Sequence, residues 1–165
     1  MTIDWKKQAQ DYREQYLQDL KELIAIPSVR DDEHKTDEYP LGEGPAKALD
    51  KFLSFGKRDG FITKNIDNLV GYIEYGSGDQ TFAMQSHADV MPAGDGWETE
   101  PFVMTEKDGS VFGRGTSDDK GPGLAAYYGL RMLKDNGIKP NMKIRLIIGT
   151  DEESDWTGMK HYFDV

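Results

Sequence analysis

Cysteine is absent from all 165 residues of the sequence. Its absence excludes disulfide bonds, thiolate zinc sites, iron–sulfur clusters and a cysteine nucleophile. Long apolar runs are missing too, since no segment approaches the ~18 apolar residues that cross a bilayer. The N-terminal segment MTIDWKKQAQDYREQ lacks the apolar stretch of a secretory signal. We therefore expect a soluble cytoplasmic chain.

Basic residues are scarce relative to acidic ones. The chain has 20 Lys and Arg against 30 Asp and Glu, which gives a net charge of −10 at pH 7. Such a chain is repelled by phosphate backbones and by anionic lipid, so we expect neither nucleic acid nor a membrane surface as a partner. Hydrophobic residues at 37% and aromatic residues at 11% are ample for a folded core in a chain of this length.

Periodic apolar residues indicate alternating helices and strands. Spacings of three and four predict helices over residues 4–26, 44–58 and 121–136, and a short helix begins near Asp155. Short β-branched and aromatic runs predict strands over 61–66, 69–75, 81–85 and 143–149, with a hairpin around Asp108 and Gly109. This order predicts the α/β class, with a mixed, mainly parallel sheet and helices on both faces.

The strand over 143–149 contains the run IRLIIG, which is typical of a strand covered on both faces. In sheets of this kind, ligands gather at the carboxyl ends of the strands. Polar residues that directly follow a predicted strand are therefore the first candidates for a functional site.

The segment TFAMQSHADV ends in the first such cluster. His87 and Asp89 are two residues apart, so on an extended strand their side chains point to the same side. One ring nitrogen of the histidine can then bind a metal while the carboxylate orients the other nitrogen. A histidine hydrogen-bonded to an aspartate, without any metal, is the alternative that these residues leave open.

The second cluster is GRGTSDDKG, residues 113–121, at the expected start of a helix. Asp118 and Asp119 repel each other unless a cation or a proton relieves the repulsion. A metal would supply that cation, Arg114 and Lys120 could do so instead, and either aspartate could cap the helix. The glycines lack the spacing of a phosphate-binding loop, so nucleotide binding is not expected.

The third cluster, GTDEESD at residues 149–155, follows the most apolar strand. A solvated charge run is one interpretation of its acidic residues. At the ligand-binding edge of a sheet, however, one glutamate can hold a metal while its neighbour acts as general base on a metal-bound water. Together the three clusters form a histidine and carboxylate set that suits Zn²⁺ or Mn²⁺.

The stretches SHADVMPAGDGWETEPF, GRGTSDDKGP and GTDEES resemble the N-terminal part of the di-zinc exopeptidase superfamily, which includes aminoacylase, carnosinase, carboxypeptidase G and the desuccinylase of diaminopimelate synthesis. The second and third stretches, with AAYYGLRML, look most like the bacterial dipeptidase branch called PepV or Xaa-His dipeptidase. The resemblance covers essentially the whole chain. It implies a zinc-dependent hydrolase of dipeptides, with two Zn²⁺ per complete site and Mn²⁺ or Co²⁺ as alternatives.

The resemblance also implies a role for each matching residue. His87, Asp118 and Glu153 match metal ligands, and Asp118 matches the carboxylate that bridges both ions. Asp89 matches the carboxylate that orients His87. Glu152 matches the general base, which takes a proton from a bridging water and passes it to the leaving amine. The peptide bond after Asp118 is implied to be cis.

The family enzyme needs parts that residues 1–165 do not contain. The resemblance implies a further acidic ligand, a last histidine ligand near the C-terminus of a much longer chain, and a lid domain. We therefore expect an N-terminal part of the catalytic domain that is inactive alone, with an open sheet edge that favours self-association. His34 and His161 are not expected to replace the missing histidine, and Trp97 is expected to anchor its loop in the core.

Two interpretations without catalysis remain open. The chain could be a metal- or peptide-binding module that keeps the peptidase fold, or an α/β interaction domain whose acidic clusters are accidental. The presence of Asp89, Asp118, Glu152 and Glu153 favours a catalytic parent, because a decayed site is expected to lose such residues.

Overall fold

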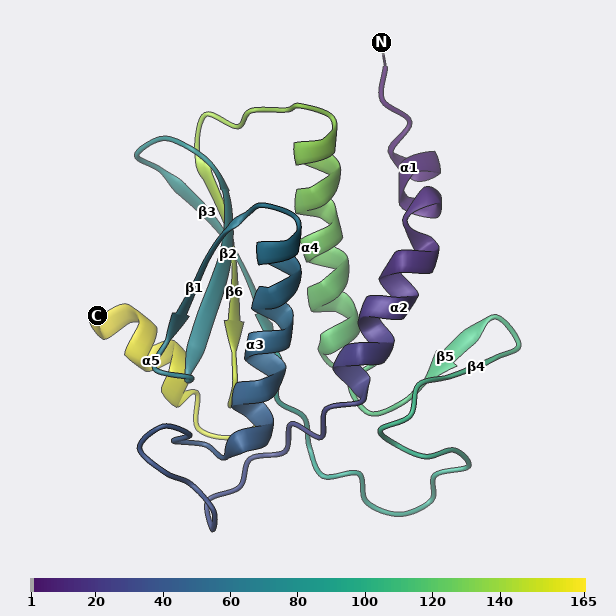
Figure 1. Ribbon diagram of the computed structural model, residues 1–165, viewed down its shortest axis with the longest axis vertical. Coiled ribbons are helices and arrows are strands. Elements are labelled where there is room, and N and C mark those ends of the chain that lie inside the picture. Colours follow the sequence, from purple (N-terminus) through teal and green to yellow (C-terminus); the bar gives the residue numbers. More distant parts are fainter. Residues whose placement is uncertain (1) are drawn as a thin grey trace.

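The computed structural model describes residues 2–165, which form a four-stranded sheet with helices on both faces (Figure 1). The helices are α1 (Trp5–Asp11), α2 (Arg13–Ile24), α3 (Glu43–Arg58), α4 (Lys120–Asp135) and α5 (Thr157–Asp164). The strands are β1 (Ile62–Ile66), β2 (Val70–Gly76), β3 (Thr81–His87), β4 (Thr105–Lys107), β5 (Ser110–Phe112) and β6 (Lys143–Gly149). β4 and β5 form a separate hairpin.

The sheet is mixed, as the sequence predicts, but it is not mainly parallel. Its order is β1-β2-β6-β3, and only β6 and β3 are parallel, because β1 is antiparallel to β2 and β2 to β6. β1 and β2 are joined by a tight turn at Asp67 and Asn68, and so short a connection permits only antiparallel pairing. β3 returns to β6 through a long crossover that contains α4, which allows parallel pairing.

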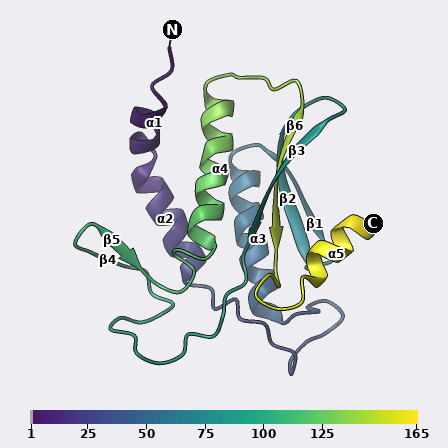
Figure 2. The ribbon, with the colours of Figure 1, turned by 180° about the vertical axis from the view of Figure 1, so that it is seen from behind.

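Alternating side chains of β2 and β6 build a core on each face of the sheet. Ile73, Leu146 and Ile148 pack with residues of α2, α3 and α4, whereas Val70 and Ile147 pack with a residue of α5. Figure 1 shows α2, α3 and α4 on one face, and Figure 2, from behind, shows α5 crossing the other. The predicted helices on both faces are confirmed, and the last residues of β6 are buried as expected.

Residues 4–26 form two helices instead of the single helix that apolar periodicity predicts. α1 ends at Asp11 and α2 begins at Arg13, with Tyr12 between them at φ −84° and ψ −8°. No residue of α1 is buried, whereas α2 contributes several residues to the core. The apolar spacing continues through both helices, so the sequence pattern does not indicate the break at a single residue between them.

The hairpin predicted around Asp108 and Gly109 is present as β4 and β5. Both turn residues have positive φ, 53° and 77°, which is the conformation that a two-residue hairpin turn requires. Within residues 2–165, no helix is both long enough and apolar enough to cross a membrane.

The sequence predicts an open sheet edge, and the described sheet has two edge strands, β1 and β3. β3 pairs with β6 on one side, and no described strand pairs with it on the other. Phe82 on this strand is 55% exposed. Self-association through this edge stays a prediction.

Candidate metal centre

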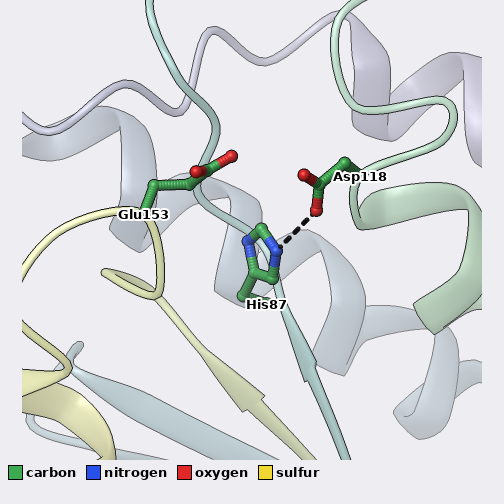
Figure 3. A group of neighbouring side chains, drawn as sticks. All are labelled: His87, Asp118 and Glu153. Atoms are coloured by element: carbon green, nitrogen blue, oxygen red, sulfur yellow. Dashed lines mark hydrogen bonds and ion pairs between the residues drawn. The ribbon is translucent and has the colours of Figure 1, made fainter.

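Three side chains of the predicted site converge at the carboxyl ends of β3 and β6. These strands are parallel neighbours, and His87, the last residue of β3, is in register with Gly149, the last residue of β6. Glu153 lies in the turn after β6, and Asp118 lies in the loop before α4. Figure 3 shows the side chains of His87, Asp118 and Glu153 gathered around one region.

The three side chains each offer one ligand atom, and these atoms are close enough together to bind a single metal ion. The ligand atoms of His87, Asp118 and Glu153 all lie within 4.8 Å of one another. Nε2 of His87 lies 3.0 Å from Oδ1 of Asp118. His87 is buried, whereas 72% of the Asp118 side chain is exposed. An ion or a substrate can therefore approach the cluster from the Asp118 side.

Asp89 lies on the other side of the His87 ring and is almost fully buried. Its carbonyl oxygen is 3.1 Å and its Oδ1 atom 3.4 Å from Nδ1 of His87. The carbonyl oxygen favours a proton on Nδ1, so in the neutral, metal-binding form of the ring the lone pair of Nε2 faces Asp118. The second carboxylate oxygen of Asp89 accepts the backbone N–H of Glu153 at 3.1 Å. Asp89 thus contacts both strand ends that supply ligands.

The two adjacent aspartates have different surroundings. The peptide bond between Asp118 and Asp119 is cis. Asp118 faces the ring of His87, whereas Oδ2 of Asp119 accepts the backbone N–H of His87 at 3.3 Å. Asp119 occupies the N-cap position of α4 but makes no side-chain capping bond. The capping role left open for Asp119 by the sequence is therefore not what the structure shows.

The start of α4 is tied to the end of α2 by Lys120. Its Nζ atom donates hydrogen bonds to the carbonyl oxygens of Leu23, at 2.9 Å, and Ile26, at 2.7 Å. Carbonyl groups at the end of a helix need such partners outside the helix. Lys120 is fully buried, and burial lowers its pKa to about 7. These bonds fix the backbone that directly follows Asp118.

Glu152 is a further acidic neighbour of the cluster. Its Oε2 atom lies 3.7 Å from Nε2 of His87, which is too far for a hydrogen bond but places the carboxylate beside the proposed ligands. The side chain is 40% exposed, so it can reach a molecule in the open part of the site. This position suits a group that exchanges protons with a bound molecule.

The cavity at this cluster is lined by His87 and Glu152, which are singled out by the sequence, and by other residues to which the sequence gave no role. The cavity measures about 330 Å³ and is lined in part by Gln85, Glu152, Trp156 and Met159. No motif marks Trp156 or Met159, because their place depends on how α5 docks on the sheet. Asp151 also lines the cavity, but nothing in the sequence distinguishes it from the other acidic residues of the same segment.

The electrostatics of the cluster favour a cation. Burial lowers the pKa of His87, but the side chains of Asp89 and Asp118 outweigh burial and raise this pKa to about 9. Burial, and then the negative charge of Asp118, raise the pKa of Glu153. The buried Oδ1 atom of Asp89 lies 3.4 Å from Nδ1 of His87 but accepts no hydrogen bond. Carboxylates crowded around one imidazole are relieved by a divalent ion, and this donor set fits Zn²⁺ or Mn²⁺.

Metal affinity is expected to rise with pH. A metal binds the unprotonated ring, so with a pKa of about 9 at His87 a proton competes at neutral pH, and affinity falls about tenfold per pH unit below that value. Without metal, the raised pKa means that protonated His87 stabilises the fold fully below pH 6.5, a contribution lost as the pH rises through about 9. Calorimetric titrations at several pH values test this, and an affinity independent of pH would contradict it.

Other residues named from the sequence lie outside the cluster. His34 and His161 each interact with a neighbouring aspartate, and neither belongs to the ligand group. Trp97 is 36% exposed, so the prediction that it anchors the core is wrong. Its ring N–H donates to the carbonyl of Ala93 at 2.8 Å, and the guanidinium of Arg114 lies 5.5 Å from the ring centroid. Trp97 fixes its own loop at the surface.

Comparison with known proteins decides the family. Residues 83–164 match the family described as Peptidase family M20/M25/M40. Over 163 residues, or 98% of the chain, the sequence is 48% identical to the Beta-Ala-Xaa dipeptidase of Lactobacillus delbrueckii subsp. lactis. The chain belongs to this M20 peptidase family. It spans 35% of the length of the Lactobacillus protein.

Solved structures agree with the M20 assignment at the level of the fold. Human carnosine dipeptidase 1 superposes with a TM-score of 0.79 at 24% identity, over 96% of this chain and 36% of the human chain. A Bacillus subtilis protein described as a dinuclear metal binding peptidase of the M20 family gives a TM-score of 0.60 at 13% identity, over 87% of this chain and 37% of that one. The chain therefore has the fold seen in part of these larger proteins.

Proposed function

We propose that these residues form the N-terminal part of the catalytic centre of a metal-dependent dipeptidase. The observation that carries the proposal is the convergence of His87, Asp118 and Glu153, with Glu152 beside them. The 48% identity to a Beta-Ala-Xaa dipeptidase supports dipeptides as the substrate class. Zn²⁺ is the proposed metal, two ions per complete site, with Mn²⁺ and Co²⁺ also suited to these donors.

In this proposal, different side chains hold the metal, orient its histidine ligand and transfer the proton. A bound divalent ion supplies Lewis acidity, which polarises a carbonyl and lowers the pKa of water. His87, Asp118 and Glu153 would hold the metal, and Asp89 keeps the His87 ring in the tautomer that binds it. The carboxylate of Glu152 accepts a proton from the attacking water and returns it to the leaving amine, as general acid–base catalysis requires.

Residues 1–165 alone are expected to show little or no hydrolysis. The described part of the chain brings together three ligand side chains, whereas a catalytic zinc usually takes about three protein ligands for each ion. Two ions would have to share these three side chains. The catalytic test is therefore made in a chimera, in which residues 1–165 replace the matching part of the Lactobacillus dipeptidase.

The chimera is expected to hydrolyse a β-alanyl dipeptide. Glu152→Gln should lower kcat by ~10²–10⁴-fold, the usual contribution of a general base, while zinc affinity stays within about threefold. Glu153→Gln, an isosteric change one residue away, should weaken zinc binding instead. Kinetics and zinc titration on both variants separate the two roles. A folded, zinc-loaded chimera without activity would contradict a catalytic role and favour a binding module.

A further inference from the structure

The turn that carries Glu152 and Glu153 is held by a residue to which no role has been given. Asp151 is buried, with 1% of its surface exposed. Its carboxylate accepts two backbone N–H groups at the start of α5, from Thr157 at 2.6 Å and from Gly158 at 3.0 Å. The two glutamates therefore lie in a loop whose ends are joined by one side chain.

The backbone of Asp151 closes the same loop from inside. Its carbonyl oxygen accepts the N–H of Ser154 at 3.2 Å and the N–H of Trp156 at 3.1 Å. Trp156 has left-handed backbone angles, φ 59° and ψ 28°, which turn the chain into α5. Asp151 thus accepts four backbone N–H groups in total from one short segment.

No cationic side chain compensates the charge of Asp151 within the part of the chain that the structure describes. The negative charge of Asp151 is compensated by N–H groups of the first turn of α5, which have no partner within the helix, and by the positive end of the helix dipole. Charge-assisted bonds of this kind are short and directional. The turn is therefore locked to the position of α5.

α5 itself has a fixed place on the sheet. A Cβ atom added at Gly158 would lie 2.2 Å from the carbonyl oxygen of Leu69, so the helix backbone packs directly against the turn before β2. The Thr150 hydroxyl donates to the same carbonyl at 2.7 Å. Asp151 connects this docked helix to the glutamates on one side, and Asp89 bonds the N–H of Glu153 on the other.

We propose that Asp151 is a positioning residue of the metal centre, which holds Glu152 and Glu153 at the distance from His87 at which they act. This proposal rests on the proposed function, because it needs a metal at the cluster. A residue that only caps α5 would affect the stability of the fold and nothing else. The two roles differ in what happens to the metal.

The test uses Co²⁺, whose visible absorption reports the geometry of its ligands, and the variants Asp151→Ala and Asp151→Asn. Asp151→Ala should weaken Co²⁺ binding by ~10–100-fold, the usual cost of losing a residue that supports a ligand, and should alter the absorption band. Asp151→Asn keeps one acceptor oxygen but loses the second, so it should weaken Co²⁺ binding less than Asp151→Ala does and should still shift the absorption band. Asp4→Ala is the control, since Asp4 also bonds the first turn of a helix, by accepting the N–H of Lys7 in α1, but lies outside the ligand group.

The outcomes separate this proposal from the proposed function. Asp151→Ala with lower stability but unchanged Co²⁺ affinity and spectrum would reduce Asp151 to a helix cap. If Asp151→Ala fails to fold, a spectrum of Asp151→Asn identical to that of the unmodified chain, at equal affinity, also overturns the proposal. An unmodified chain that binds no Co²⁺ would overturn the metal centre itself, and the proposal with it.

Discussion

Replacing Asp118 by alanine is expected to lower the affinity of the chain for Zn²⁺ by more than ~100-fold, beyond the usual cost of losing a supporting residue. The Oδ1 atom of Asp118 lies 3.0 Å from Nε2 of His87, and the side chain is largely exposed. Its removal therefore takes away a charged ligand without opening a hole in the core. Calorimetric zinc titration of both chains measures the loss.

A charge-matched control separates ligation from general electrostatics. Asp95 is an exposed acidic residue in the loop before β4 and does not belong to the ligand group. Asp95→Ala removes the same formal charge, so its zinc affinity should stay within about twofold, as expected for an exposed charge in high dielectric. Equal affinities for Asp118→Ala and the unmodified chain would remove Asp118 from the site.

Gly123→Ala is expected to lower the free energy of unfolding by ~2–3 kcal/mol, at the upper end of the cost of overpacking. Gly123 lies in α4 where this helix packs closely on β3. A Cβ atom there would lie 2.0 Å from Oγ and 3.0 Å from Cβ of Ser86, the residue before His87. The hydroxyl can rotate away, but the two Cβ atoms can separate only if helix and strand move apart.

Gly129 in the same helix is the control. A Cβ atom at Gly129 meets nothing within 4 Å, and the residue is exposed. Gly129→Ala should therefore raise the free energy of unfolding by ~0.5–1 kcal/mol, the helix-propensity difference between the two residues. Urea unfolding of both variants checks the pair. Equal destabilisation by the two changes would contradict the close packing of α4 on β3.

Much of the site could be predicted because it depends on local rules. His87 and Asp89 are two residues apart, and the strand period places both on one side. The cluster around Glu152 follows the most apolar run, and an apolar strand buried on both faces carries its next residues to the ligand edge of a sheet. These two rules place His87 and Glu152, which are 65 positions apart in sequence, in one predicted site. In the structure, Nε2 of His87 lies 3.7 Å from Oε2 of Glu152.

Other features depend on tertiary packing and were not predictable from the sequence. Spacing rules alone do not decide which of two adjacent aspartates faces His87, and only the family resemblance pointed to Asp118; the choice is set by the backbone at the start of α4, where Lys120 bonds the end of α2. Asp151 is one acidic residue among several, and its capping role exists only once α5 has docked. The sheet was wrongly predicted to be mainly parallel because apolar strands read alike whether they are parallel or antiparallel. The Asp67–Asn68 turn makes β1 antiparallel to β2, and β2 is antiparallel to β6 as well.

The most direct test of the metal centre is a crystal structure of the chain with Zn²⁺, measured on both sides of the zinc absorption edge. We expect an anomalous peak between Nε2 of His87 and the carboxylates of Asp118 and Glu153. The chain also offers two exposed histidine–aspartate pairs, His34 with Asp31 and His161 with Asp67. Zinc at either of these pairs, with none at the His87 cluster, would contradict a metal centre at His87, Asp118 and Glu153.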